Sequence, residues 1–186
     1  MGVLPTGGGK TICFSSIVRD HGGYAGVVVH RREIIKQISL SLGAFDIKHR
    51  IVAPPAVVAI VRRAHMRKFG KSFVDPHALV GVASAQTLAS KSTENNQLVM
   101  RWIKQCDLAV FDEGHHYVGD GSWGKAVRLF DHAERLLFVS ASPDRADGKP
   151  LSVCDVLVEG RDTQWLIDHG RLSSFKYYAP ESNLGV

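Results

Sequence analysis

The chain has few cysteines, and their spacing excludes two kinds of site. The 186 residues include three cysteines, Cys13, Cys106 and Cys154, which lie too far apart for a C-x-x-C motif. An odd number of widely spaced cysteines supports neither a disulfide framework nor a cysteine-ligated zinc site. The sequence therefore favours a reducing compartment.

Long apolar runs are also missing. No basic segment followed by an apolar one opens the chain, and no uninterrupted apolar run approaches the roughly 18 residues that span a bilayer. We therefore expect no signal peptide, no membrane segment and no membrane partner, and the expected location is the cytoplasm.

Acidic residues are missing from one long stretch. Residues 47–74 contain no Asp or Glu, and their basic residues are Lys48, Arg50, Arg62, Arg63, Arg67, Lys68 and Lys71. The formal net charge of +5 and an isoelectric point near 9.2 suit a polyanionic partner without requiring one. Arg63, Arg67 and Lys71 recur at every fourth position of a predicted helix and would share one face. That face is equally compatible with tracking along a nucleic acid and with a solvated surface.

The chain contains short apolar segments separated by helical patterns, which predicts an α/β fold with a mostly parallel sheet and helices on both faces. The predicted strands are residues 26–29, 78–83, 107–111, 135–140 and 155–158, with a clipped strand at 2–4. Helices are predicted from residue 10, over 33–40 and from 56 to about 68, and a loop over 90–96. The length and the 45% hydrophobic content fit one domain.

A glycine-rich segment near the start of the chain has the form of a phosphate-binding loop. Residues 4–11 read LPTGGGKT, which matches G-x-x-x-x-G-K-[ST] except that Leu4 replaces the first glycine. Successive glycines can turn several backbone N–H groups toward one anion, and a helix that begins at Lys10 adds its positive end. We expect Lys10 to reach the β and γ phosphates and Thr11 to ligate Mg²⁺. By itself the segment could also be a glycine-rich turn that contains a lysine by chance, which is the less favoured alternative.

Two carboxylates follow a predicted strand at the place where a P-loop protein has its second signature. Asp112 and Glu113 come directly after the strand that ends at residue 111. We expect Asp112 to hold Mg²⁺ and Glu113 to act as the base that orients or deprotonates the attacking water. Alone, the pair would be a solvated loop. His115 and His116 extend it into a zinc-like cluster, but adjacent side chains diverge and no further ligands have suitable spacing.

Five segments occur in the order found in superfamily 2 helicases: residues 5–11, 30–37, 84–88, 112–116 and 140–148. The chain resembles the first RecA-like, ATP-binding lobe of a DEAD/DEAH-box type enzyme, in particular the bacterial and phage DNA helicases related to restriction-enzyme motor subunits. The resemblance implies a P-loop NTPase lobe over residues 1–172 with its first strand clipped. Residues 173–186 would begin the connection to an absent second lobe.

The resemblance also implies roles for individual residues. ATP and Mg²⁺ would be bound by Pro5, Thr6, Gly7, Gly8, Gly9, Lys10, Thr11 and His115, with Thr11 and Asp112 on the metal. The catalytic residues would be Lys10, Asp112 and Glu113. The nucleic-acid backbone would contact Arg31, Arg32, Ser84, Gln86 and Thr87. Coupling of hydrolysis to movement would involve Ser140, Ala141 and Ser142. Gly114 replaces the family's more usual Ala or Cys, and we expect little consequence.

The implied function is that of an ATP-dependent DNA helicase or translocase, with RNA as an alternative track. In that family a second lobe, in cis or in trans, supplies an arginine to the transferring phosphate. Because the chain ends where that lobe should begin, we expect weak or no turnover from it alone. Two other functions stay open: a nucleotide- or nucleic-acid-binding module without turnover, and a P-loop NTPase of another function.

Overall fold

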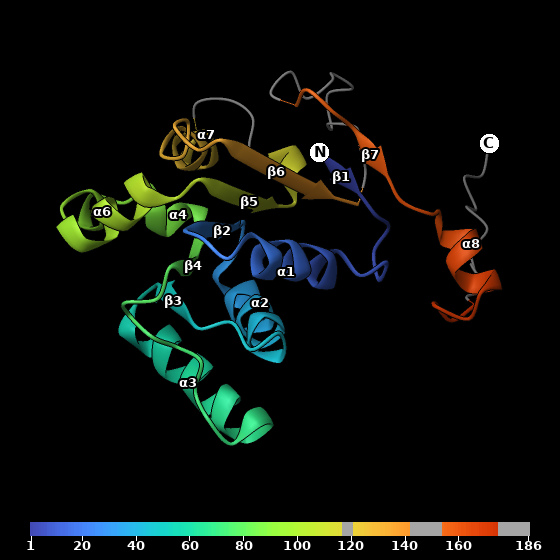
Figure 1. Ribbon diagram of the computed structural model, residues 1–186, viewed down its shortest axis with the longest axis horizontal. Helices are drawn as coiled ribbons and strands as arrows, with labels where there is room; N and C mark the ends of the chain where they lie inside the picture. Colours follow the sequence, from blue (N-terminus) through green and yellow to red (C-terminus); the bar gives the residue numbers. More distant parts are fainter. Residues whose placement is uncertain (117–120, 142–153, 175–186) are drawn as a thin grey trace, which may run out of the picture.

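The computed structural model describes residues 1–116, 121–141 and 154–174. In these ranges the strands form a seven-stranded, all-parallel sheet in the order β3-β4-β2-β5-β6-β1-β7. Helices cover both faces: α1, α2 and α3 lie on one side, and α4, α6 and α7 on the other (Figure 1). The predicted α/β, RecA-like class is confirmed.

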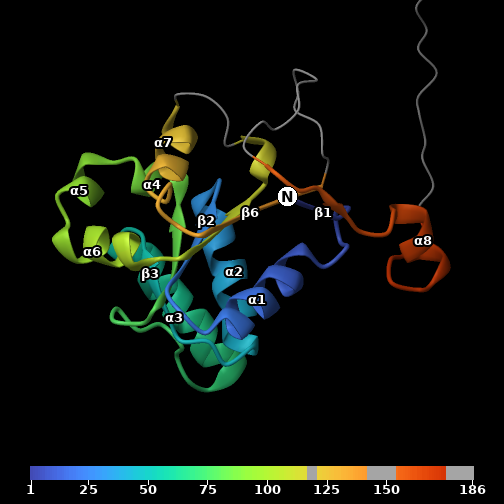
Figure 2. The ribbon, with the colours of Figure 1, turned by 45° about the horizontal axis from the view of Figure 1, so that its top comes forward.

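The strands are β1 (Gly2–Val3), β2 (Ala25–Val29), β3 (His49–Val52), β4 (Val80–Ser84), β5 (Leu108–Asp112), β6 (Arg135–Ser140) and β7 (Val158–Glu159). The helices on the first face are α1 (Lys10–His21), α2 (Arg32–Ala44) and α3 (Pro55–Phe69). The other helices are α4 (Ala85–Leu88), α5 (Lys91–Glu94), α6 (Gln97–Gln105), η1 (Gly114–His116), α7 (Ser122–Arg128) and α8 (Thr163–Asp168). Figure 2 shows α8 to one side, beyond β1.

Central strands are buried on both faces, which explains their continuous apolar runs. Every residue of β2, β4 and β5 is buried. Successive side chains of a strand point to opposite faces, so Val27 and Val29 join a core with α1 and α2, whereas Val28 joins one with α4, α6 and α7. Each such side chain contributes about 1.5–3 kcal/mol when fully buried.

Two predictions from the sequence were wrong. Residues 90–96 are not one loop, because the Ser90 hydroxyl accepts a hydrogen bond from the Thr93 N–H and caps the single turn of α5. Lys71 does not continue the helical face of Arg63 and Arg67, since α3 ends at Phe69 with Gly70 in the left-handed conformation. The edge strand β3 was not predicted at all; it pairs with β4 alone among the named strands and is only partly apolar.

The described residues contain no helix that is both long enough and apolar enough to cross a bilayer.

A buried hydrogen-bond chain ties α3 to the rest of the lobe. The Phe73 N–H donates to His65 Nδ1 (3.2 Å), which leaves His65 Nε2 to donate to the Ser39 hydroxyl (2.9 Å). The hydroxyl donates in turn to His49 Nε2 (2.6 Å), and His49 Nδ1 donates to the Ile47 carbonyl (2.8 Å). This sequence of donors fixes both tautomers. It requires both rings to be neutral, and burial lowers the pKa of His49 to about 4.

Replacing Ser39 with Ala should lower the free energy of unfolding by about 1–3 kcal/mol, because two buried ring nitrogens lose their shared partner. Urea titration followed by circular dichroism measures this change. Ser72→Ala, at an exposed hydroxyl, is the control and should change stability by less than about 0.5 kcal/mol. Equal stability of the two variants would show that the chain of hydrogen bonds contributes nothing.

Candidate nucleotide and nucleic-acid site

Three neighbouring strands end at one edge of the sheet and bring distant segments together. In the strand order, β6 lies between β5 and β1. The register pairs Asp112 of β5 with Val139, and Val3 of β1 with Ser140. The glycine-rich segment that follows β1, the acidic pair and Ser140 therefore meet at the carboxyl ends of the strands, where open α/β sheets place their ligands.

The glycine-rich segment is a tight turn that only glycine accommodates at several positions. Gly7 and Gly9 have φ angles of 79° and 87°, in the left-handed region. The Gly8 N–H donates to the Pro5 carbonyl at 2.9 Å, and a Cβ on Gly8 would lie 2.9 Å from that same oxygen. The turn leads directly into α1, whose first N–H groups have no acceptor within the helix. It is therefore shaped to hold an anion.

Leu4 departs from the motif, yet its backbone groups are used. The Leu4 N–H donates to the Ser140 carbonyl at 3.0 Å, and the Leu4 carbonyl accepts from Lys10 Nζ at 3.4 Å. Because both contacts are made by the main chain, a leucine side chain at this position does not prevent the loop from forming.

The glycine-rich loop and the acidic pair line one hollow of about 390 Å³. Its lining residues are Thr6, Gly7, Gly9, Lys10, Thr11, Ile12, Ile34, Gln37, Asp112 and Glu113. Asp112 is 7% exposed. Burial, and then the neighbouring Glu113, raise the pKa of the Asp112 carboxyl to about 6, while Lys10 opposes the rise. A buried carboxylate that one lysine compensates only in part suits a divalent cation.

Glu113 adopts a conformation that is rare for residues other than glycine. Its φ is 56°, in the left-handed region. The next residue packs tightly on β6: a Cβ on Gly114 would lie 2.8 Å from the Cβ of Phe138. The expectation that Gly114 has little consequence is therefore corrected, since a larger residue would push η1 away from the sheet. Strained backbone of this kind persists where the surrounding structure fixes it.

His115 links the acidic pair to the end of β6. Its Nδ1 lies 2.8 Å from Ser140 Oγ and 3.6 Å from Glu113 Oε2. Ser140 is fully buried, and Ala141 directly follows it with its side chain exposed. Ser142, the third predicted coupling residue, lies outside the described residues.

The predicted nucleic-acid residues fall into two groups. Arg31, Arg32 and Gln86 line a hollow of about 350 Å³, and the Gln86 side-chain amide donates to the His30 carbonyl at 2.8 Å. Ser84, in contrast, is fully buried, and its hydroxyl accepts from the Thr87 N–H as the N-cap of α4. The structure thus brings Arg31 and Arg32 close to Gln86, whereas the Ser84 hydroxyl is buried and caps α4.

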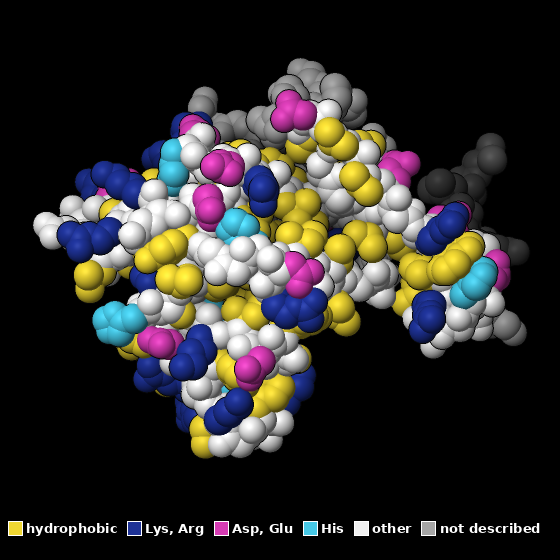
Figure 3. All heavy atoms as spheres, in the orientation of Figure 1, with side chains coloured by type: hydrophobic (Ala, Val, Ile, Leu, Met, Phe, Trp, Pro, Cys, Tyr) yellow, Lys and Arg dark blue, Asp and Glu magenta, His cyan; other side chains and the backbone are white. Residues whose placement is uncertain are grey.

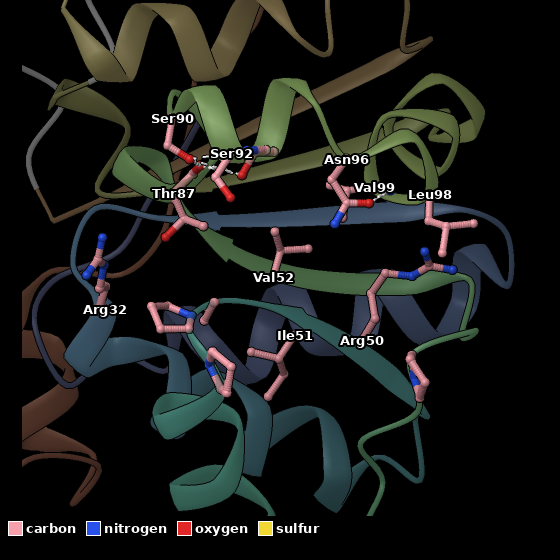
Figure 4. A pocket seen from close by; sticks show the side chains of 15 residues that line it. Arg32, Arg50, Ile51, Val52, Thr87, Ser90, Ser92, Asn96, Leu98 and Val99 are labelled. Carbon is pink, nitrogen blue, oxygen red and sulfur yellow. Dashed lines mark hydrogen bonds between the residues drawn. The ribbon is translucent and has the colours of Figure 1, made fainter.

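A larger groove of about 590 Å³ begins at Arg32 and Thr87 (Figure 4). It runs between the start of α3, at Pro54 and Pro55, and the segment from Ser90 to Val99. At its far end, the Arg50 guanidinium donates to the Ala78 carbonyl at 2.8 and 2.6 Å. Sequence reasoning missed the polar side chains of Ser92 and Asn96 here because it treated residues 90–96 as a plain loop.

Sequence reasoning also missed a cluster of rings between the two regions. His30 follows β2, and its ring centroid lies 5.4 Å from that of His116 and 6.1 Å from that of Trp123. The rings of His116 and His115 are 4.0 Å apart. Since β2 and β5 are neighbours in a parallel sheet, a histidine after each could have suggested this contact. In the parts of the chain that are described, no three His, Cys, Asp or Glu residues converge as a metal site.

The family follows from comparison with known proteins. The family model described as "Type III restriction enzyme, res subunit" matches residues 1–145. The chain belongs to this family. The chain is 25% identical over 179 residues to the 51.5 kDa protein of a Lactococcus phage (isolate 7-9), covering 94% of the chain and 31% of the relative. It is 28% identical over 193 residues to IRC3 of Saccharomyces cerevisiae, a protein provisionally named an ATP-dependent helicase. This match covers 94% of the chain and 25% of IRC3.

The chain therefore spans about a quarter to a third of the length of these curated relatives. Among solved structures it matches the UvsW helicase of bacteriophage T4 with a TM-score of 0.55 and 16% identity, over 77% of the chain and 46% of that protein. A second UvsW structure matches with a TM-score of 0.53, over 76% of the chain and 26% of that protein. This likeness shows the fold. The predicted resemblance to helicases related to restriction-enzyme motor subunits is confirmed by the family model.

Asp112→Asn should stabilise the fold above pH 6. The raised pKa means that the folded chain holds the Asp112 proton more tightly than the unfolded chain does, so stability is lost as the pH rises from about 4 through about 6. Asparagine removes this cost, which we expect to be about 1–3 kcal/mol at pH 8 and close to zero at pH 4.

Urea unfolding of both proteins across this pH range gives the difference directly. Asp131→Asn, at an exposed carboxylate, is the control. A difference that stays constant from pH 4 to pH 8 would contradict the account of Asp112.

Proposed function

We propose that the chain is the ATP-binding lobe of an ATP-dependent DNA helicase or translocase, which binds Mg-ATP and the nucleic-acid backbone. One observation supports it most: the glycine-rich loop, Lys10 and the acidic pair line a single hollow at the carboxyl edge of the sheet. Membership of the res-subunit family and the helicase fold agree with this function.

In this proposal the nucleotide's phosphates lie in the turn of residues 5–11, where backbone N–H groups and the start of α1 face them. Lys10, which bonds the Leu4 carbonyl in this structure, turns to the β and γ phosphates. Thr11 and Asp112 would hold Mg²⁺, and the bound ion would neutralise phosphate charge. The fit is supported by the burial of Asp112, whose carboxylate lacks a full counter-charge.

Glu113 is the proposed base. Glu113 lines the hollow beside Asp112, and its side chain is 25% exposed, so it is accessible to a water molecule. It orients that water and accepts its proton. His115, whose Nδ1 hydrogen-bonds Ser140 Oγ and lies 3.6 Å from Glu113 Oε2, passes the state of the nucleotide to the coupling segment of Ser140, Ala141 and Ser142.

The nucleic acid lies across the ends of β2 and β4. Arg31 and Arg32 provide positive charge, and the Gln86 amide and Thr87 hydroxyl provide short polar contacts to phosphate oxygens. Ser84 takes part by capping α4 and so holding Thr87 in place. Contacts of this kind read no bases, and binding should therefore depend strongly on salt and weakly on sequence. DNA is the proposed track, and RNA would use the same contacts.

A second lobe is the proposed partner, in cis after residues 173–186 or in trans. Among the described residues that line the hollow, Lys10 is the only basic one. An arginine from a second lobe accelerates phosphoryl transfer by roughly 10³–10⁵ in related systems. We therefore propose that residues 1–172 bind ATP but turn it over weakly when alone.

Calorimetry on the isolated chain tests the nucleotide site. Mg-ATP should bind, and Lys10→Ala should weaken binding at least about tenfold, because a charge-assisted hydrogen bond contributes about 1.5–3 kcal/mol. Glu113→Gln should keep the affinity within about threefold, since its role is in turnover rather than in binding the nucleotide.

Lys36→Ala is the matched control, since it removes the same charge from an exposed position on the neighbouring helix α2. If Lys10→Ala binds Mg-ATP as well as Lys36→Ala does, the nucleotide site is assigned wrongly.

A further inference from the structure

The outer face of α3 carries basic side chains that the proposed function does not use. Arg62, Arg63, Arg67 and Lys68 are exposed on this helix, whereas Val61 and His65 on its inner face are fully buried. Lys and Arg side chains surround the lower end of the molecule in Figure 3, where Figure 1 places α3. At 3.6 residues per turn, Arg62, Arg63 and Arg67 lie within about 140° of one another around the helix. Lys68 lies further round, with its Nζ 5.3 Å from the centroid of the Phe69 ring. We call the three arginines the α3 basic face.

No carboxylate neutralises the α3 basic face. Among the described residues none of its three members forms an ion pair, whereas Arg19 pairs with Asp20 at 2.8 Å. The nearby Asp46 is bound by Lys71 at 3.3 Å. The helix dipole accounts for cations in the last turn, such as Arg67 and Lys68. It does not account for Arg62 and Arg63, which lie mid-helix, and Arg63 also repels Arg67 at i+4.

The face is rigid and has the dimensions of a nucleic-acid backbone. The buried contacts of His65 with Ser39 and Phe73 hold α3 against α2 and the segment after it. At 1.5 Å per residue, Arg62 to Arg67 spans about 7.5 Å, which matches roughly two phosphates of one strand at 3.4 Å each. Rigid presentation lowers the entropy lost when these side chains bind.

The α3 basic face begins next to the proposed nucleic-acid site, which we take to hold a single strand. Pro54 and Pro55, at the start of α3, line the same groove as Arg32 and Thr87 (Figure 4). A nucleic acid that leaves that groove over the prolines therefore meets α3 next.

The chemistry favours double-stranded over single-stranded nucleic acid. Sites for single strands combine cations with aromatic rings on which bases stack. The aromatic side chain within α3, Phe69, instead packs edge-on against His65 and Phe73, with centroids 5.5 Å from each. A convex helix with unpaired cations and no free ring suits phosphates whose bases are already paired.

We propose that the α3 basic face binds the phosphate backbone of a DNA duplex that adjoins the strand held by Arg32 and Thr87. The inference rests on the proposed function, because that function makes DNA the partner. It adds a separate duplex contact on the side of the lobe, outside the groove.

Fluorescence anisotropy with a blunt DNA duplex of about 20 base pairs tests this directly. The triple variant Arg62→Ala, Arg63→Ala, Arg67→Ala should bind the duplex roughly ten- to a hundredfold more weakly at 50 mM salt. Its slope of log affinity against log salt should be shallower by about 2–3, since each lost phosphate contact removes about 0.9. Affinity for a single strand of the same length should stay within about threefold.

The matched control is Arg101→Ala, Lys104→Ala, Lys125→Ala, which removes the same charge from exposed positions on α6 and α7. Circular dichroism checks that both triples are folded. The proposal is overturned if the α3 triple keeps the duplex affinity and salt slope, or if the control triple loses as much.

A second pair of variants separates this inference from the proposed function. Arg32→Ala and Gln86→Ala should weaken single-strand binding. If they do not, the nucleic-acid site across the ends of β2 and β4 is assigned wrongly, while a selective loss of duplex binding in the α3 triple would still establish the α3 basic face.

Discussion

The burial of the Asp112 carboxylate opposite Lys10 is the constraint on which the site depends. A carboxylate removed from water is costly, and here both burial and Glu113 raise its pKa, to about 6. Lys10 compensates part of this cost, because the parallel sheet brings the loop that contains it close to Asp112. The loop follows β1 and the acidic pair follows β5, at one edge of the sheet with β6 between them. In the proposed function, a nucleotide-bound cation would complete that compensation and would relieve the cost of burying the carboxylate.

Tight packing around this edge fixes the backbone of the glycine-rich loop and of the acidic pair. Gly8 lies against Pro5, and Gly114 lies against Phe138, at distances that admit no side chain. Glu113 is held in the left-handed region beside them. His115 Nδ1 hydrogen-bonds Ser140 Oγ and lies 3.6 Å from Glu113 Oε2, so it adjoins both the hollow and the end of β6. In the proposed function, this contact would carry a change at the nucleotide to β6.

The sequence predicts the central fold well because strands buried on both faces, such as β2 and β5, have continuous apolar runs. It also predicts that residues 4–11 and the acidic pair meet, since both follow strands of one parallel sheet. It does not predict β3, an edge strand whose His49 and Arg50 owe their placement to the Ser39 hydroxyl and the Ala78 carbonyl. Nor does it predict α5, which depends on a local hydrogen bond of Ser90, or the contact between the rings of His30 and His116.

The most direct test of the central claim is a paramagnetic one, in which Mn²⁺ replaces Mg²⁺ in the complex with ATP and amide signals are recorded by NMR. If the loop and the acidic pair hold one metal-bound nucleotide, the amides of Thr11 and Glu113 should broaden together at the same low Mn²⁺ concentration, while those of α3 stay sharp. Broadening at only one of the two segments, or at neither, would contradict the account.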